Sequence, residues 1–253
     1  MPELPDVTVY IEALERRIAG RTLHKVRLAN PFVLRTVEPV PRDVAGKRVI
    51  EIRRVGKRIV LALEDDLFIV IHLMIAGRFR WLPPNAKIPG KLGLAAFDFD
   101  DGTLLLTEAG SKRRASIHIV RAWDAVREHD AGGIEPLEIT RDAFKDALTR
   151  ERHTLKRTLT DPHVFAGIGN AYSDEILHRA RLSPVQMTTN LDDEEMTRLY
   201  DAVQSTLRDW IERLRKETGD KFPEKVTAFR PEMAVHGRYG KPCPDCGTPV
   251  QHI

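Results

Sequence analysis

Hydrophobic side chains near the N-terminus recur at the spacing of an amphipathic helix. Val7, Ile11, Leu14 and Ile18 are separated by four, three and four residues, so they fall on one face of a helix. Gly20 follows them, where a glycine commonly ends a helix. The pattern therefore predicts a helix that begins at Asp6 and ends before residue 20.

Between residues 23 and 123 the pattern changes to short runs of Val, Ile, Leu and Phe, separated by turn signals such as Asp100-Asp101-Gly102. These runs predict strands near residues 23–28, 48–54, 58–64, 67–74, 77–82, 92–99, 103–107 and 115–121. Strands this short, joined by tight turns, favour an antiparallel sandwich or barrel over parallel crossover units.

The second half of the chain is predicted to be helical. Gly132-Gly133 and Pro136 indicate a hinge after the last strand. The predicted helices run from Thr140 to about Arg150, from Thr154 to Thr160, from Asn170 to before Pro184, and from Asp192 onward, with Glu195 in capping-box spacing. The predicted fold class is α+β multidomain, with an N-terminal helix and antiparallel β-sandwich followed by helices.

Composition shows that the chain can build a core. Of its 253 residues, 42% are hydrophobic and 30% charged, with a formal net charge of +3, which argues against disorder. The longest apolar stretch, residues 67–77, is about half a membrane span and predicts a buried strand. The N-terminus lacks the features of a secretory signal, so we expect an intracellular protein, in the cytoplasm or nucleoid, without a membrane partner.

Basic residues gather locally although the net charge is small. The first 100 residues carry 17 basic and 12 acidic side chains. Two basic clusters stand out, one with Arg53, Arg54, Lys57 and Arg58 and one with Lys112, Arg113 and Arg114. Such clusters suit a phosphate backbone, although a solvated strand face explains any single one of these residues better.

The start of the chain carries the first candidate chemistry. Removal of Met1 would leave Pro2 with a secondary amine of pKa about 8, which can attack an aldehyde-like carbon. The adjacent Glu3 could supply or accept protons. The alternative is that Pro2 only blocks aminopeptidases and that Glu3 complements the dipole of the following helix.

A glycine-containing loop before the helix predicted at Asn170 is the second candidate. Gly167 and Gly169 leave the loop without side chains, and Asn170 is expected to be the N-cap. The loop amides, with the Asn170 side chain beside them, would then receive a phosphate. Glycine before a capped helix is common, so a purely structural cap is the alternative.

Together these motifs resemble the formamidopyrimidine-DNA glycosylases, the Fpg/Nei group of base-excision repair enzymes. That family typically opens with Pro-Glu-Leu-Pro-Glu-Val, and residues 2–7 read Pro-Glu-Leu-Pro-Asp-Val. Its helix-two-turn-helix segment, Gly-Asn-x-Tyr-x-x-Glu, is matched by residues 169–175. Other ordered matches cover essentially the whole chain: Gly56-Lys57, His72-Leu73 before Gly77, Glu135-Pro136-Leu137, and Val235-His236-Gly237-Arg238 before Cys-Pro-x-Cys-Gly.

The resemblance implies roles for individual residues. Pro2 would be the nucleophile that displaces a damaged base from deoxyribose C1′, and Glu3 would shuttle protons during opening of the sugar ring. Lys57 would contact phosphate and assist the acid chemistry, and Asn170 would bind the phosphate that flanks the lesion. The further DNA contacts expected are Gly169, Lys112, Arg113, Arg114 and Lys156.

The resemblance also implies a domain order. It predicts a catalytic β-sandwich domain over residues 1–125, a hinge over 126–137, a helix-two-turn-helix DNA-binding domain over 138–234, and a partial zinc finger over 235–253. The implied partner is double-stranded DNA that contains a damaged base or an abasic site, and the expected state is a monomer.

The implied activity is that of a bifunctional DNA glycosylase and AP lyase. Such an enzyme would remove oxidised purines, 8-oxoguanine or formamidopyrimidine, and nick the strand by β,δ-elimination through a Schiff base at Pro2. Two alternatives stay open: an endonuclease VIII-like enzyme for oxidised pyrimidines, and a lesion-binding relative with AP lyase activity only.

Two loops depart from the family pattern. The usual His-Leu-Gly-Met-Ser-Gly reads His-Leu-Met-Ile-Ala-Gly, so Ile75 takes the methionine's place and Met74 lies one position early; both are expected to contact DNA. The usual Arg-Arg-Phe-Gly reads Arg-Arg-Ala-Ser, so Ala115 replaces an intercalating phenylalanine, while Arg113 keeps the position that reads the orphaned base. Opposite-base selectivity is therefore open, and compensation by Phe79 or another loop is one alternative.

The C-terminal segment contains one C-x2-C pair, Cys243 and Cys246, whereas a four-cysteine zinc ribbon needs two. The pair is expected to be a zinc half-site, with zinc binding left open, and a Cys2His2 site with His236 and His252 is the less favoured alternative. No organic cofactor is expected. Three further histidines are expected to be packed or at the surface: His72, His118 and His178.

Overall fold

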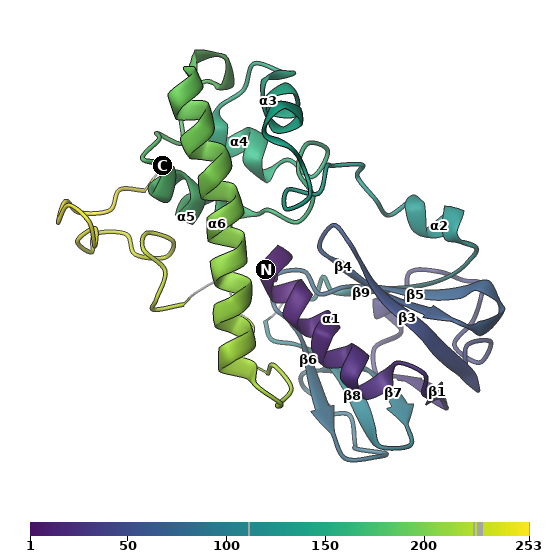
Figure 1. The fold of residues 1–253 in the computed structure, drawn as a ribbon. Coiled ribbons are helices and arrows are strands. Elements are labelled where there is room, and N and C mark those ends of the chain that lie inside the picture. The colour runs from purple at the N-terminus through teal and green to yellow at the C-terminus, as the bar shows by residue number, and fades with distance from the viewer. Residues whose placement is uncertain (111, 225, 227–229, 253) are drawn as a thin grey trace. The chain divides into compact units, whose positions relative to one another are not determined.

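The computed structural model describes residues 1–110, 112–224, 226 and 230–252 (Figure 1). These residues form two compact units. The first comprises residues 1–2, 6–130 and 214–226, and the second residues 3–5, 131–213 and 227–253. Helix α1 (Leu4–Ile18) and helix α6 (Asp193–Thr218) each contribute residues to both units.

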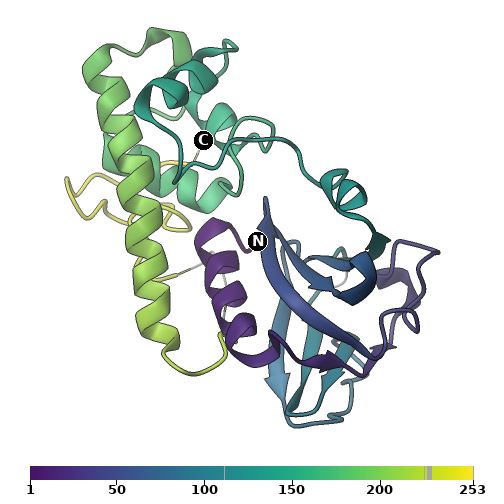
Figure 2. The same cartoon turned by 45° about the vertical axis from the view of Figure 1, so that its right-hand side comes forward.

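The first unit contains two antiparallel sheets, with strand orders β1-β3-β4-β5-β9 and β2-β7-β8-β6 (Figure 2). Its elements are β1 (Thr22–Leu23), β2 (Lys25–Leu28), the 3-10 helix η1 (Pro31–Val33), β3 (Lys47–Val55), β4 (Arg58–Leu63), the 3-10 helix η2 (Glu64–Asp66), β5 (Leu67–His72), β6 (Gly77–Leu82), β7 (Gly93–Phe99), β8 (Gly102–Glu108), β9 (Ser116–Arg121) and α2 (Trp123–Arg127). The antiparallel sandwich predicted from the sequence is confirmed.

The structure differs from the sequence prediction at one strand and at the start of the first helix. The strand expected over 23–28 is wrong as a single element, because β1 pairs with β3 in one sheet and β2 pairs with β7 in the other. The first helix begins at Leu4, because the Leu4 N–H donates to the Gly167 carbonyl (2.9 Å) and its side chain is buried in the core of the second unit. Pro5 is compatible with this start, because a first-turn residue needs no N–H partner.

One core fills the space between the sheets and α1. Tyr10 lies at its centre, fully buried, and its ring packs edge-on against Phe79 with centroids 5.7 Å apart. Phe222, which follows α6, packs on the other side of Tyr10 at 5.9 Å. The residues after α6 therefore complete the core of the first unit.

Several strand ends meet at one end of this sandwich. Arg58 at the start of β4 lies opposite His72 at the end of β5, which in turn lies opposite Ser116 at the start of β9. In the other sheet Gly77 at the start of β6 lies opposite Glu108 at the end of β8. The β3–β4 hairpin, the β5–β6 turn and the β8–β9 segment consequently share this end.

The second unit is helical, with α3 (Arg141–Thr149), α4 (Leu155–Thr160), α5 (Asn170–Ala180), the 3-10 helix η3 (Thr188–Asn190) and most of α6. Thr140 Oγ1 accepts from the Ala143 N–H (3.3 Å) as the predicted cap of α3. Asp192 accepts from the Glu195 N–H (2.7 Å) and Glu195 accepts from the Asp192 N–H (3.2 Å), which confirms the predicted capping box.

Candidate active site

The Glu3 carboxylate is buried at the start of α5. Glu3 is 2% exposed, and its oxygens accept hydrogen bonds from the backbone N–H groups of Gly169 (2.8 Å), Ala171 (3.0 Å) and Tyr172 (3.1 Å). The positive end of the helix dipole adds to this compensation of the negative charge. The carboxylate is therefore held in one orientation within the second unit.

The expectation that Asn170 caps α5 and that the loop amides hold a phosphate is wrong. Gly169 is the N-cap and Asn170 is the first helical residue. The amides that would have faced a phosphate donate to Glu3, 166 to 169 residues away in the sequence. A buried carboxylate that accepts three N–H bonds satisfies more of the helix start than a local side chain, which accepts one. The Asn170 side chain is left exposed.

Pro2 lies directly before this fixed carboxylate and is buried. On the other side of Glu3, the bond from the Leu4 N–H to the Gly167 carbonyl holds the chain. Because one peptide bond joins Pro2 to Glu3, an amine at Pro2 stays within one residue of an immobile carboxylate. This arrangement suits a nucleophile with a proton carrier beside it.

Lys57 lies at the tip of the β3–β4 hairpin. Val55 pairs with Arg58, and Gly56 between them has a φ of 55°, a left-handed conformation that lets a two-residue turn close. The Arg54 guanidinium donates to the Gly56 carbonyl (2.9 Å) and stiffens the turn. The Lys57 side chain is half-buried at the end of the sandwich.

His72 lies next to this hairpin. Burial, together with the positive charges of Arg58 and Lys57, lowers the pKa of His72 to about 4. Burial also lowers the pKa of Arg58. His72 is thus neutral at pH 7, which limits the repulsion among neighbouring cations at this end of the sandwich.

The Glu108 carboxylate fixes the backbone of the second basic cluster, residues 112–114. Glu108 is 1% exposed, and its carboxylate accepts from the backbone N–H groups of Arg114 (2.9 Å) and Ala115 (3.0 Å). The Arg113 guanidinium donates to the Lys91 carbonyl (2.6 Å). All three basic side chains of the cluster are exposed, so a buried carboxylate fixes the backbone of a segment whose cations face outward.

The β5–β6 turn presents Ile75, which is 58% exposed, while Met74 is half-buried. Gly77 is required at the end of the turn, because a Cβ there would lie 2.1 Å from the Leu73 carbonyl oxygen. Phe79 is fully buried in the core. The structure therefore does not support the alternative that Phe79 compensates for the missing phenylalanine.

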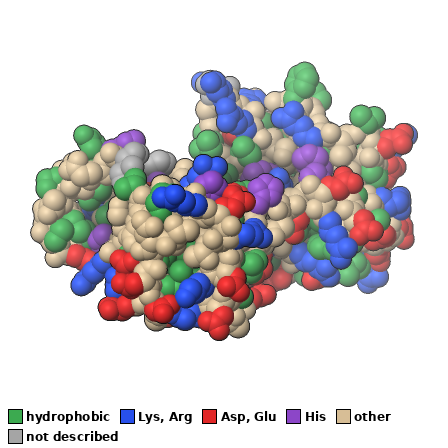
Figure 3. Space-filling view, turned by 90° about the horizontal axis from the view of Figure 1, so that it is seen from above, with side chains coloured by type: hydrophobic (Ala, Val, Ile, Leu, Met, Phe, Trp, Pro, Cys, Tyr) green, Lys and Arg blue, Asp and Glu red, His purple; other side chains and the backbone are tan. Residues whose placement is uncertain are grey.

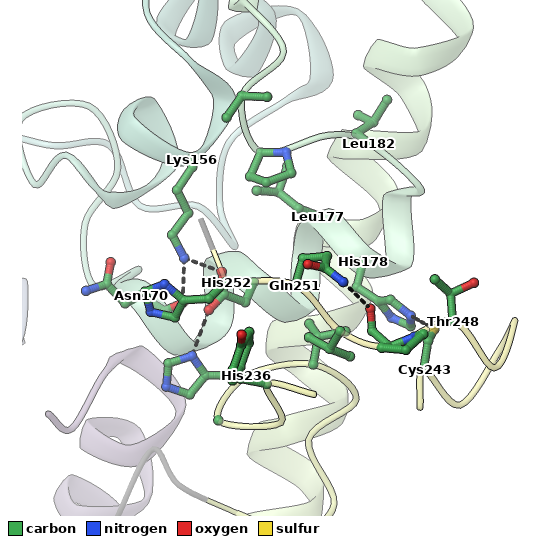
Figure 4. A pocket seen from close by; sticks show the side chains of 18 of the residues that line it. Lys156, Asn170, Leu177, His178, Leu182, His236, Cys243, Thr248, Gln251 and His252 are labelled. Atoms are coloured by element: carbon green, nitrogen blue, oxygen red, sulfur yellow. Dashed lines mark hydrogen bonds and ion pairs between the residues drawn. The ribbon is translucent and has the colours of Figure 1, made fainter. Parts of the chain in front are cut away.

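Two predicted DNA contacts, Lys156 and Asn170, line a cavity of about 860 Å³ in the second unit (Figure 4). Lys156 Nζ donates to the Asn170 carbonyl (2.9 Å) and pairs with Asp174, whose other oxygen lies 2.7 Å from His236 Nδ1. Against the opposing effect of burial, the hydrogen bonds from His236 and Lys156 lower the pKa of Asp174. The sequence did not predict the pairing of Asp174 with His236, a residue considered there only as an alternative zinc ligand.

Glu175, the last residue of the Gly-Asn-x-Tyr-x-x-Glu motif, binds backbone N–H groups. Its carboxylate accepts from the backbone N–H groups of Ala234 (2.7 Å), Val235 (2.9 Å) and His236 (3.0 Å). It therefore ties the segment before the cysteines to α5. The available signal in the sequence was a pair of acidic residues, Asp174-Glu175, within the helix predicted from Asn170.

Cys243 and Cys246 lie on one tight turn, in which the Cys243 N–H donates to the Thr248 carbonyl (2.8 Å). Hydrogen bonds with Thr248 lower the pKa of the Cys246 thiol, and His178 Nε2 lies 3.3 Å from Cys243 Sγ. Among the residues that the structure describes, no group of three or more His, Cys, Asp or Glu side chains could hold a metal ion. These residues do not complete a tetrahedral zinc site, and the half-site stays a prediction.

Basic and acidic side chains are intermingled on the face shown in Figure 3. Contacts to a phosphate backbone therefore depend on the local clusters rather than on a large surface of one sign. Each helix in the described part of the chain is too short or too polar to span a bilayer.

Comparison with known proteins adds two family matches. The formamidopyrimidine-DNA glycosylase N-terminal domain matches residues 1–114, and the formamidopyrimidine-DNA glycosylase H2TH domain matches residues 133–221. The formamidopyrimidine-DNA glycosylase of Heliobacterium modesticaldum is 34% identical over 99% of this chain and 94% of its own length. That of Thermus thermophilus is 33% identical over 99% of this chain and 92% of its own length.

Solved structures give the same result. The Lactococcus lactis Fpg in complex with DNA that contains an abasic site is 25% identical, with a TM-score of 0.86 over 99% of this chain and 94% of that one. A mutant of the same protein in complex with DNA that contains Fapy-dG has a TM-score of 0.86 over 100% and 94%. The folds therefore agree over the length of the chain.

Proposed function

Because the chain belongs to the formamidopyrimidine-DNA glycosylase family, a family of DNA glycosylases with AP lyase activity, we propose that it excises oxidised purines from double-stranded DNA and then nicks the strand. The favoured substrates are 8-oxoguanine and formamidopyrimidine. The Lactococcus lactis relative, which binds DNA containing Fapy-dG, supports this choice. DNA as the substrate implies an intracellular site of action at the nucleoid, and the proposed active form is a monomer.

Pro2 starts the proposed reaction. After Met1 is removed, the Pro2 nitrogen attacks C1′ of the damaged nucleotide, the bond from C1′ to the base breaks, and the base leaves with a proton. Glu3 relays a proton to the sugar ring oxygen, so that the ring opens and an iminium forms between Pro2 and C1′. Loss of a C2′ proton then expels the 3′ phosphate, and a second elimination expels the 5′ phosphate.

The remaining site residues bind the DNA in this proposal. An extruded nucleotide needs its flanking phosphates fixed, and Lys57 and the exposed Asn170 side chain are assigned to them. Arg113, held by the Lys91 carbonyl, is assigned to the base opposite the lesion.

The single observation that carries the proposal is the Glu3 carboxylate, anchored by three backbone N–H groups directly after Pro2. A protein that only binds DNA has no use for a fixed carboxylate next to an N-terminal amine. Borohydride trapping on a duplex with one abasic site tests it. We expect a covalent adduct with free Pro2, and at least about tenfold less with Pro2→Gly or with Met1 retained.

Asp98→Asn is the matched control, because Asp98 is a buried carboxylate that pairs with Arg27 (2.6 Å) away from the site. It is expected to trap as well as the parent protein. If the protein with Met1 retained were trapped equally, the nucleophile would be another amine. If free Pro2 gave no adduct, the lyase assignment would be wrong.

Oxidised pyrimidines are the second candidate substrates. The Lactococcus lactis protein has also been solved with DNA that contains an oxidised pyrimidine. Parallel excision assays on 8-oxoguanine and thymine glycol duplexes separate the two candidates, and faster excision of thymine glycol would favour the second.

A further inference from the structure

Three chain segments converge where the β8–β9 segment ends. The N–H groups of Ala29 and Asn30 donate to the Leu94 carbonyl (2.9 and 3.2 Å), which joins the segment after β2 to the start of β7. The Arg35 N–H donates to the Ile117 carbonyl (2.9 Å), which joins the same segment to the start of β9. The segment after β2 is therefore fixed at both ends.

Phe32 projects from the middle of this fixed segment. It is 77% exposed, although it belongs to η1, whose next residue, Val33, is buried in the core at 3% exposure. The Phe32 N–H donates to the Asn30 side chain (3.0 Å), which caps the turn. An aromatic ring is thus held in solvent by a short, anchored turn.

The segment that carries Phe32 lies beside the start of β9, because Leu34 forms a parallel bridge with Ile117. Leu34 follows Phe32 by two residues, and Ile117 follows Ala115 by two. Arg113, two residues before Ala115, is bonded to the carbonyl of Lys91, and Lys91 lies three residues before Leu94. The exposed aromatic ring and the arginine assigned to the opposite base therefore belong to one cluster of segments.

We propose that the Phe32 ring enters the base stack at the lesion and fills the gap left by the extruded nucleotide. The inference rests on the proposed function. Extrusion of a nucleotide leaves a gap that proteins commonly fill with an apolar side chain. Ala115 is too short and is 3% exposed, with its backbone held by Glu108. Among the exposed large hydrophobic side chains described in the first unit, Phe32 is the one aromatic residue.

Fluorescence of 2-aminopurine, placed opposite a tetrahydrofuran abasic analogue in a duplex, tests this role without any catalytic step. Wild-type protein should change the fluorescence on binding, because an inserted ring disturbs the stacking of the opposite base. Phe32→Ala should lose most of the change, and Phe32→Trp should retain it. Single-turnover excision of a damaged base by Phe32→Ala should fall about 5- to 150-fold, the range expected for one base-aromatic stack.

Val37→Ala is the matched control, because Val37 is 85% exposed and follows on the same segment. It should behave as wild type in both assays. Phe32→Ala with the fluorescence change and excision rate of Val37→Ala would overturn the proposal. Failure of the proposed function gives a different result: the wild-type protein would then form no borohydride adduct at an abasic site, whatever residue occupies position 32.

Discussion

Two regions of the molecule treat buried charge differently: the surroundings of α5 in the second unit, and the strand ends around His72 in the first. Around α5 the acids meet donors: Glu3 accepts three backbone N–H groups, Glu175 accepts three others, and the half-buried Asp174 lies between Lys156 and His236. Around His72 in the first unit, burial and neighbouring cations lower the pKa of His72 to about 4, and burial lowers the pKa of Arg58. The acids around α5 are compensated by donors, whereas His72 is neutral at pH 7.

This difference separates two tasks. A proton carrier works only in a fixed position, and the start of α5 provides one for Glu3. A surface that receives a phosphate instead gains from positive charge that the protein has not already neutralised. The acid chemistry is therefore prepared within the protein, while the sandwich end is suited to an anion from outside.

The largest expected effect is a loss of incision rate when the fixed carboxylate of Glu3 is removed. Glu3→Gln places an amide group against backbone N–H donors and takes away the proton carrier, so single-turnover incision of an abasic duplex should fall about 10²- to 10⁴-fold. Binding to an uncleavable tetrahydrofuran duplex, measured in parallel, should change far less. An equal loss with Asp98→Asn would assign the effect to folding rather than to proton transfer.

A smaller effect, on stability, is expected from removal of Glu108, whose carboxylate binds the backbone of Arg114 and Ala115. Glu108→Ala leaves the N–H groups of Arg114 and Ala115 without their acceptor, so the free energy of unfolding should fall by about 1–3 kcal/mol. Urea unfolding measures the loss. Glu108→Gln, which keeps one acceptor oxygen, should lose less. If Glu108→Ala unfolds like the wild type, other contacts fix the segment.

An effect of no greater size, visible only as the pH falls, is expected from the neutral His72. Because the pKa of His72 is lowered from 6.5 to about 4 in the folded state, the unfolded chain takes up the proton first as the pH falls. Stability is therefore complete above pH 6.5 and decreases towards about pH 4. His72→Gln should flatten this decrease by about 1–3 kcal/mol, measured by urea unfolding across that range. His118, with a pKa also near 4, retains part of the slope, and an unchanged slope would contradict the assignment.

The local pattern of apolar and turn residues was sufficient to predict most strands of the sandwich. The strands predicted at 48–54, 58–64 and 77–82 lie within two residues of β3, β4 and β6, because turn residues and apolar runs set their ends. The split between β1 and β2 could not be predicted in this way. It depends on which distant strand each half pairs with, a choice that the residues around His24 do not encode.

The candidate site was predictable by residue type but not by geometry. Pro2, Glu3 and Asn170 were identified from motifs, yet the partner of Glu3 lies 166 residues or more away. Local preference ranks asparagine well as a cap, and a long-range carboxylate overrides it. The pairing of Asp174 with His236, 62 residues away, was not predicted for the same reason.

The distance in sequence between Glu3 and its three donors also has a consequence during biosynthesis. The amino end leaves the ribosome first, but residues 169–172 follow only after more than 160 further residues have been added. At typical translation rates that takes roughly 10–30 s. During that interval Pro2 cannot adopt its final, buried setting, so an aminopeptidase meets a terminus that is still accessible. Maturation of the amine therefore precedes its enclosure, and a slow aminopeptidase would leave a fraction of chains folded with the amine blocked.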